Sequence, residues 1–192
     1  RSLAMVAYGD LDCSVIDELP PGRQPVTTTL MDQTRRDAVM RRVGSACREG
    51  RQAYWVCTAI EESDTLDIEA AEATLDQLQQ ALPDVRIGLV HGKLKPAEKA
   101  TVMAAFKAGE LQLLVATTVI EVGVDVPNAS LMIIDNAERL GLAQLHQLRG
   151  RVGRGAVDSH CLLLYRQPLS DTAQQRLKVM QESHDGFVIA EA

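Results

Sequence analysis

The segment Arg86–Ala116, RIGLVHGKLKPAEKATVMAAFKAGELQLLVA, contains a complete strand, helix and second strand. Its first five residues form an apolar strand pattern, Pro96 stands where a helix begins, and Gly109 stands where that helix ends. The run Leu111–Ala116 follows and is apolar enough to lie at the centre of a sheet. This order of elements is the signature of a parallel βαβ unit.

The same alternation continues on both sides of this unit. We expect further strands at Val26–Leu30, Tyr54–Thr58, Leu131–Asp135 and Cys161–Tyr165, and further helices at about residues 34–48, 67–82 and 170–184. The apolar residues of the helical segments recur at the spacing of one buried helix face. The sequence therefore predicts an α/β fold of three layers, in which helices flank a parallel sheet of five or six strands, with a C-terminal helical extension.

A proline-rich segment divides the chain near its start. The sequence ELPPGR, Glu18–Arg23, blocks both a helix and a central strand. We therefore expect a linker and the tail of a preceding domain in residues 1–24, one compact domain in residues 25–167, and a separate helical element in residues 168–192. Because the sequence begins at Arg1 without Met, we expect it to be a piece of a longer protein.

Composition and charge limit the classes of function. The net charge of −6 at pH 7 argues against a surface that binds nucleic acid as a whole, so any such contact must be local. Four cysteines occur without a C-x-x-C pair, which predicts free thiols in a reducing compartment and argues against a metal site. No run approaches the ~18 consecutive apolar residues of a membrane span, and no signal peptide is present. We expect a cytoplasmic protein without membrane contact.

Polar residues follow the predicted strands. In an open parallel sheet, ligands gather beyond the carboxyl ends of the strands. The residues expected along this edge are Thr58, Glu61, Glu62, His91, Gly92, Thr117, Thr118, Asp135 and Arg139. A lone histidine after a strand is more often a polar turn residue, and threonines at such a position more often cap a helix. The edge is nevertheless where a ligand is expected.

The segment QLRGRVGRG, Gln147–Gly155, concentrates positive charge in an otherwise acidic chain. One face of the predicted helix holds Leu142, Leu145, Leu148 and Val152. At about 100° per residue, Gln147, Arg151 and Arg154 cluster on the opposite face. Guanidinium groups match phosphate oxygens and keep their charge at any working pH, so the pair suits a phosphoryl transition state. The alternative is a solvated basic helix that its glycines merely cap.

A second polar segment is VATTVIEVGVDVPNAS, Val115–Ser130. Here a buried strand ends in two threonines, and a short apolar turn leads to Gly123, Asp125 and Pro127. Small hydroxyls at a strand end can reach a nucleic-acid backbone, and a carboxylate can accept a hydrogen bond from a ribose hydroxyl. Taken alone, Asp125 is more often a turn former.

Together and in this order, the two segments resemble the second RecA-like domain of superfamily 2 helicases and translocases. VATTVIEVGVDVP resembles their fifth motif, and QLRGRVGR resembles their sixth, the arginine-finger motif. SVIDELPPGR, IEESD and the stretch from GLVHGKLKP to RGRVGRG are similar to RecG, a family of bacterial branched-DNA helicases, over essentially the whole chain. RSLAM resembles the tail of the third helicase motif, and SDTAQQRLKVMQESHDGFVIAEA resembles the opening of the RecG translocation motif, a helical hairpin.

The resemblance implies roles for the residues of both segments. Arg151 and Arg154 would reach the γ-phosphate of ATP held by the other motor domain, and Gln147 would link the nucleotide state to DNA. Gly123 and Asp125 would lie by the nucleotide. The residues implied to face DNA are Thr58, His91, Gly92, Thr117 and Thr118.

No phosphate-binding loop of the form G-x-x-x-x-G-K-[ST] occurs in these residues. The resemblance therefore implies that ATP and Mg²⁺ are held mainly by the first motor domain, and that this chain alone hydrolyses nothing. It also implies a monomeric motor of the bacterial nucleoid that remodels branched or duplex DNA in recombination and repair, with the first RecA-like domain of the same chain as partner. Two alternatives stay open: a transcription-repair coupling translocase, and a non-enzymatic RecA-like binding module.

Overall fold

The structure is a computed structural model that describes residues 26–58, 64–117, 126, 128–152 and 158–182. Its elements, in chain order, are β1 (Val26–Asp32), the 3₁₀ helix η2 (Gln33–Arg35), α1 (Arg36–Arg48), β2 (Gln52–Cys57), α2 (Asp64–Ala81), β3 (Ile87–Val90), α3 (Pro96–Lys107), β4 (Leu113–Thr117), β5 (Ala129–Ile134), the 3₁₀ helix η3 (Ala137–Arg139), α4 (Leu142–Arg149), β6 (Ser159–Tyr165) and α5 (Asp171–Glu182). Except for the end of α4, the predicted strands and helices lie where the sequence places them, within a few residues at either end.

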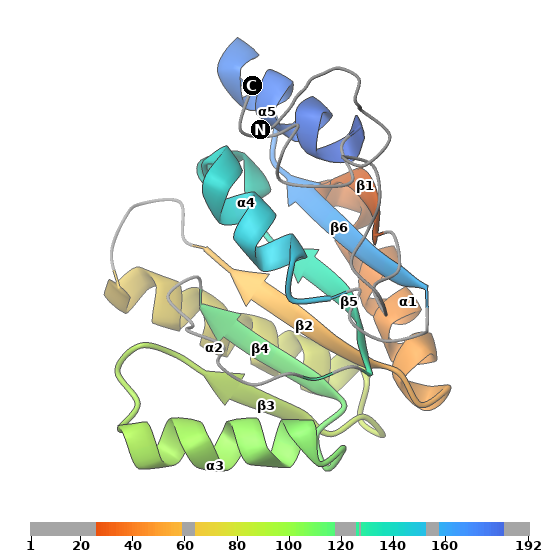
Figure 1. Cartoon of the computed structure of the whole chain (residues 1–192), viewed down its shortest axis with the longest axis vertical. Coiled ribbons are helices and arrows are strands. Elements are labelled where there is room, and N and C mark those ends of the chain that lie inside the picture. The colour runs from red at the N-terminus through yellow and green to blue at the C-terminus, as the bar shows by residue number, and fades with distance from the viewer. Residues whose placement is uncertain (1–25, 59–63, 118–125, 127, 153–157, 183–192) are drawn as a thin grey trace, which may run out of the picture.

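The six strands form a single sheet in the order β1-β6-β5-β2-β4-β3 (Figure 1). Every neighbouring pair is parallel. The strands β2, β4 and β5 are buried along their whole length, as expected for central strands covered on both faces. The predicted α/β fold with a parallel sheet is confirmed.

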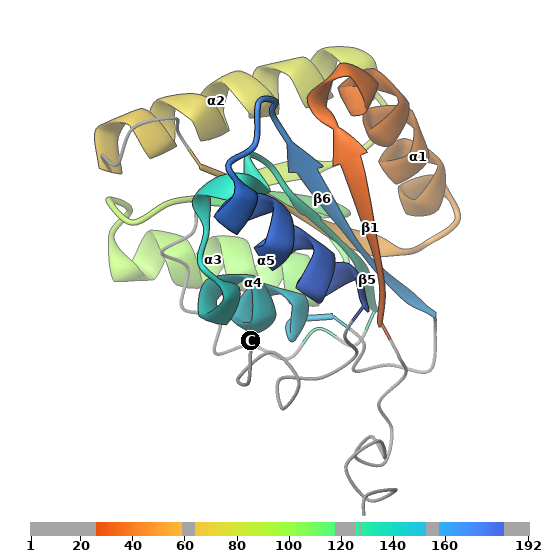
Figure 2. The same cartoon turned by 90° about the horizontal axis from the view of Figure 1, so that it is seen from above.

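Helices cover both faces of the sheet. Figure 2 shows α1 and α2 on one face and α3, α4 and α5 on the other. Successive residues of a strand point to opposite faces, so Tyr54 packs on the side of Phe106 in α3 while Trp55 packs on the side of Val43 in α1. The ring centroids of Tyr54 and Phe106 are 5.0 Å apart. Two buried clusters, one on each face, thus make the predicted three layers.

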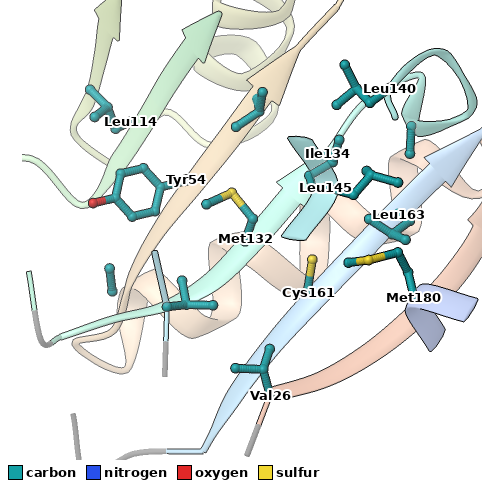
Figure 3. Packing of buried hydrophobic residues seen from close by; sticks show 14 of the residues in the cluster. Val26, Tyr54, Leu114, Met132, Ile134, Leu140, Leu145, Cys161, Leu163 and Met180 are labelled. Atoms are coloured by element: carbon teal, nitrogen blue, oxygen red, sulfur yellow. The ribbon is translucent and has the colours of Figure 1, made fainter. Parts of the chain in front are cut away.

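The helix α5 belongs to the same core as the sheet. Figure 3 shows Met180 of α5 close to Leu163 of β6, with Leu145 of α4 and Ile134 of β5 in the same cluster. Met180 and Leu145 have no solvent exposure. The C-terminal helix predicted after Pro168 therefore packs against this domain. Its assignment to a separate translocation motif in residues 168–192 stays a prediction.

The predicted helix from Leu142 through Arg154 ends earlier than expected. α4 stops at Arg149, and Gly150 caps it. Glycine costs roughly 1 kcal/mol in a helix relative to alanine, and the second glycine three residues later repeats that penalty. The single helical face proposed for Gln147, Arg151 and Arg154 is therefore wrong for Arg151, which lies in the turn after the helix.

In the described ranges, no helix is long and apolar enough to cross a membrane.

Candidate nucleotide and DNA site

The carboxyl ends of the strands bring several of the predicted polar residues to one edge. The strands β5, β2, β4 and β3 are adjacent in the sheet. Asp135 directly follows β5, Thr58 follows β2 and His91 follows β3, whereas Thr117 is the last residue of β4. The register aligns these ends, because Cys57 pairs with Thr117 in the parallel ladder. The expectation of one shared edge is confirmed for these four residues. Glu61, Glu62, Thr118, Gly123, Asp125 and Arg154 lie outside the described residues.

Thr58 joins the end of β2 to the end of β5. Its hydroxyl donates a hydrogen bond to the carbonyl of Asp135 at 3.0 Å, and the side-chain amide of Asn136 donates to the carbonyl of Thr58 at 2.7 Å. Asn136 has a left-handed backbone with φ of 52°, which turns the chain sharply out of the sheet. Because the Thr58 side chain is buried and hydrogen-bonded to Asp135, its role in this structure is to hold the ends of β2 and β5 together. A contact between Thr58 and DNA stays a prediction.

The carboxylate of Asp135 is the centre of a polar network that the sequence did not predict. It forms an ion pair with Arg36 of α1 and accepts a hydrogen bond from the side-chain amide of Gln33. The indole nitrogen of Trp55 lies 3.5 Å from it. The Arg36 guanidinium also donates to Thr74 of α2 at 2.9 Å and lies 5.2 Å from the Trp55 ring centroid. One arginine thus ties two helices and two strands together beneath the edge.

Thr117 and His91 differ in how they face solvent. Thr117 is almost fully buried, and within the described residues its hydroxyl has no hydrogen-bond partner. His91 is half-buried, and its Nδ1 accepts a hydrogen bond from the backbone of Lys93 at 3.2 Å, while Gly92 is exposed. His91 thus closes the turn after β3, which agrees with its interpretation as a polar turn residue. A DNA contact at Thr117, His91 or Gly92 stays a prediction.

The helix α4 presents one face to the protein and the other to solvent. Leu145 of α4 and Val152 in the turn after it are buried, as predicted for the apolar face, whereas Gln147 is exposed. The turn after α4 is held by a hydrogen bond from the Arg151 backbone amide to the Leu148 carbonyl at 3.0 Å, and Arg151 is half-buried. Gln147 and Arg151 are therefore carried by one short, anchored segment.

Arg149, which the sequence did not single out, anchors that segment. It is buried, and its Nη1 donates to the carbonyl of Met180 in α5 at 3.0 Å and to the Thr28 hydroxyl of β1 at 3.4 Å. Of the arginines in this region, the buried one is thus structural. Sequence alone gives a weak signal: position 149 is four residues after Leu145, so it falls on the buried face of α4.

The titratable groups of this part of the chain do not form a metal site. Among the described residues, no three His, Cys, Asp or Glu side chains gather closely enough to hold an ion. The thiols of Cys47, Cys57 and Cys161, here called the buried thiols, are free. Burial raises the pKa of Cys47 to about 11 and those of Cys57 and Cys161 to about 12, so the thiols stay protonated and unreactive at neutral pH.

The model of the helicase conserved C-terminal domain matches residues 34–156. The chain belongs to this family. The match spans Arg36 and Asp135, the helix α4 and both sequence segments that suggested a helicase.

Relatives of this helicase C-terminal domain carry the name ATP-dependent DNA helicase RecG. The chain is 71% identical over its whole length to the RecG of Escherichia coli strain K12, of which it covers 28%. It is 46% identical over its whole length to the RecG of Bacillus subtilis strain 168, again covering 28% of that protein. The domain therefore spans little more than a quarter of the length of these relatives.

Solved structures agree with this assignment. A structure of RecG bound to a three-way DNA junction superposes with a TM-score of 0.77 at 42% identity, over 91% of this chain and 22% of that one. Domain 2 of the DEAD-box helicase Mss116p, bound to an RNA duplex, superposes with a TM-score of 0.58 at 15% identity, over 86% of this chain and 72% of that one. The second likeness supports the fold alone.

Proposed function

We propose that this chain is the second motor domain of an ATP-dependent DNA helicase that remodels branched DNA in recombination and repair. The observation that carries the proposal is the identity of 71% with a RecG over the whole chain, which includes the arginine-finger motif. The replication forks and Holliday junctions expected as substrates share the branched geometry of the three-way junction in the matching RecG structure.

In this mechanism ATP binds between the two motor domains, and Arg151 and Arg154 approach its γ-phosphate when the cleft closes. The arginines neutralise the charge of the phosphoryl transition state. Hydrolysis then reopens the cleft and moves this domain along DNA. Gly123 and Asp125 lie by the nucleotide, and Gln147 senses its state. The residues that face the DNA track are Thr58, His91, Gly92, Thr117 and Thr118.

Mg²⁺ belongs to the first motor domain in this proposal. The described residues of the present chain offer no group of three ligands for it, so its part in charge neutralisation is assigned to the partner domain. Partner domain and metal together hold ATP, and this chain completes the site. The motor acts as a monomer in the cytoplasm, at the nucleoid, where its DNA substrate lies.

The test is DNA-stimulated ATP turnover in the full-length parent carrying Arg154→Ala or Arg151→Ala, with ATP binding measured separately. An arginine finger supplies roughly 10³ to 10⁵ in rate, so turnover should collapse while ATP binding persists. Arg41→Ala is the matched control, because Arg41 is exposed on α1 and lies outside the helicase motifs. Near-normal turnover in both finger variants would overturn the proposed role.

The isolated chain provides a second test. We expect it to hydrolyse no ATP with or without DNA, because the phosphate-binding loop is missing from its 192 residues. DNA-stimulated ATP turnover by the purified chain, surviving a second purification step, would contradict the division of labour between the two motor domains.

A further inference from the structure

A basic hollow lies at the opposite, amino-terminal edge of the sheet. It has a volume of about 150 Å³ and is enclosed by the C-terminal half of α1, by Arg51 just after α1, and by the first residues of β5 and β6. Because α1 returns from the end of β1 to the start of β2, its last turns lie over the beginnings of the strands (Figure 1). The hollow is therefore remote from the edge proposed to meet ATP and DNA.

Three nitrogen-bearing side chains converge on this hollow. Arg42 comes from α1, Arg51 from the turn before β2, and His160 from β6, where it pairs in register with Leu131 of β5. Among the described residues, these three side chains have no hydrogen-bond or ion-pair partner. The other two arginines of α1 with described polar contacts, Arg36 and Arg48, each pair with an aspartate. The guanidiniums of Arg42 and Arg51 and the imidazole of His160 therefore keep their donors available at the hollow.

The charge of the hollow is positive in a chain whose net charge is −6. The pKa of His160 is lowered first by burial and then by the positive charges of Arg42 and Arg51, with Asp158 acting in the opposite direction. Both guanidiniums therefore act on the same ring. Glu49 also lines the hollow but forms no ion pair with either arginine.

The floor of the hollow strengthens any charge-assisted contact made there. Ala46 and Leu131 supply apolar walls, which lower the local dielectric response and increase the attraction between opposite charges. The carbonyl of Ala46 at the end of α1 accepts hydrogen bonds from the backbone amides of Arg51 at 3.0 Å and Glu49 at 3.1 Å, so it has donors without the guanidiniums. Ser45 adds a hydroxyl donor at the rim.

We propose that the hollow between α1 and the starts of β5 and β6 binds a phosphate group through Arg42, Arg51 and His160. Two guanidiniums offer planar pairs of donors that match the oxygens of a tetrahedral oxyanion, and the imidazole offers one more donor. The proposal does not depend on the proposed function, because the hollow lies at the other edge of the sheet. Inorganic phosphate and a DNA phosphodiester present the same chemistry and are the two possible sources.

The test uses the imidazole resonances of the purified chain, followed by NMR. His160 is assigned by the signal that disappears in His160→Gln. Inorganic phosphate is added at constant ionic strength, with chloride in the reference titration. We expect a saturable change at His160 and a rise in its pKa, because a bound phosphate offsets the positive charge of the two arginines.

Variants separate specific binding from a general effect of salt. Arg42→Gln with Arg51→Gln should weaken the phosphate response by about tenfold or more, since each charge-assisted hydrogen bond contributes on that scale. Arg41→Gln, one residue away on α1 but not lining the hollow, should leave it unchanged. All of these arginines are at the surface or half-buried, and an unaltered Tm checks that the variants fold.

A short DNA duplex then distinguishes the two sources. A His160 response to duplex that the double arginine variant loses identifies a DNA phosphodiester, and a response to inorganic phosphate alone identifies the free ion. Two results would overturn the proposal: no saturable change at His160 with either probe, or a change that persists undiminished in the double variant.

Discussion

Replacing Arg36 by Met tests whether the network around Asp135 holds the site edge together. The Asp135 side chain is 7% exposed and the Arg36 side chain 21%, so the substitution leaves a nearly buried carboxylate without its cation. Removing one partner of a buried pair costs about 3 to 5 kcal/mol. Because Gln33 and Trp55 still contact the carboxylate and Arg36 is partly exposed, we expect Arg36→Met to lower the free energy of unfolding by about 2 to 4 kcal/mol. Methionine keeps the length and helix propensity of the side chain.

In a domain of this size, that loss lowers Tm by roughly 5 to 15 °C, measured by circular dichroism of the purified chain. Arg48→Met is the matched control: Arg48 is also in α1 and also pairs with an aspartate, Asp84, but both side chains are about half exposed. Exposed pairs contribute little, and added salt screens them further. A Tm loss for Arg36→Met no larger than that for Arg48→Met would refute the reasoning that burial makes the first pair matter.

Three further predictions concern the core. Arg149→Met removes the donor to the buried Met180 carbonyl and should cost about 1 to 3 kcal/mol in urea unfolding, with faster amide exchange confined to α5 and its neighbours as the sign that this contact is the cause. Gly44→Ala brings a new methyl group against the end of the buried Leu82 side chain; overpacking costs about 1 to 3 kcal/mol and the higher helix propensity of alanine offsets about 1 kcal/mol of it, so we expect a net loss of about 0 to 2 kcal/mol by the same assay. A gain of about 1 kcal/mol, the full propensity term, would mean that Leu82 moves aside at no cost. The buried thiols have pKa values in the folded protein above the ordinary value of 9.0. Their contribution to stability is therefore complete below pH 9 and is lost as the pH rises towards 11 to 12. Urea unfolding of the wild-type chain and of Cys161→Ala at pH 8 and pH 10 measures this loss, and an equal change in stability between the two pH values in both proteins would contradict it.

The alternation of strands and helices was predictable because its signals are local. The apolar run before His91, the proline that opens α3 and the glycine that closes it are each read within a few residues. Gly109 has a φ of +83°, as its place after a helix requires. Since all strands are parallel, predicting the strand ends was enough to predict a shared edge of polar residues.

The contacts beneath that edge were not predictable, because they join residues far apart in sequence. Arg36 and Asp135 are 99 positions apart, and no periodicity in either segment indicates that they meet. The end of α4 was misjudged for a different reason: the spacing of apolar residues continues through Val152, but two glycines weaken the helix after Arg149. Position on a helical face is therefore informative only as far as the helix extends.

The burial of Arg149 explains how a short helix can hold Arg151, the proposed arginine finger, in place. With only the residues Leu142–Arg149, α4 is too short to be stable alone, since isolated helices need roughly 12 to 15 residues. Leu145 and Arg149 fix its orientation from one side, by packing and by hydrogen bonds to α5 and β1. The direction of Gln147 and the position of the turn that carries Arg151 are then set relative to the sheet before any nucleotide binds. In the proposed mechanism, such preorganisation lowers the entropic cost of cleft closure, because a group that is already positioned needs no further loss of conformational freedom at the transition state.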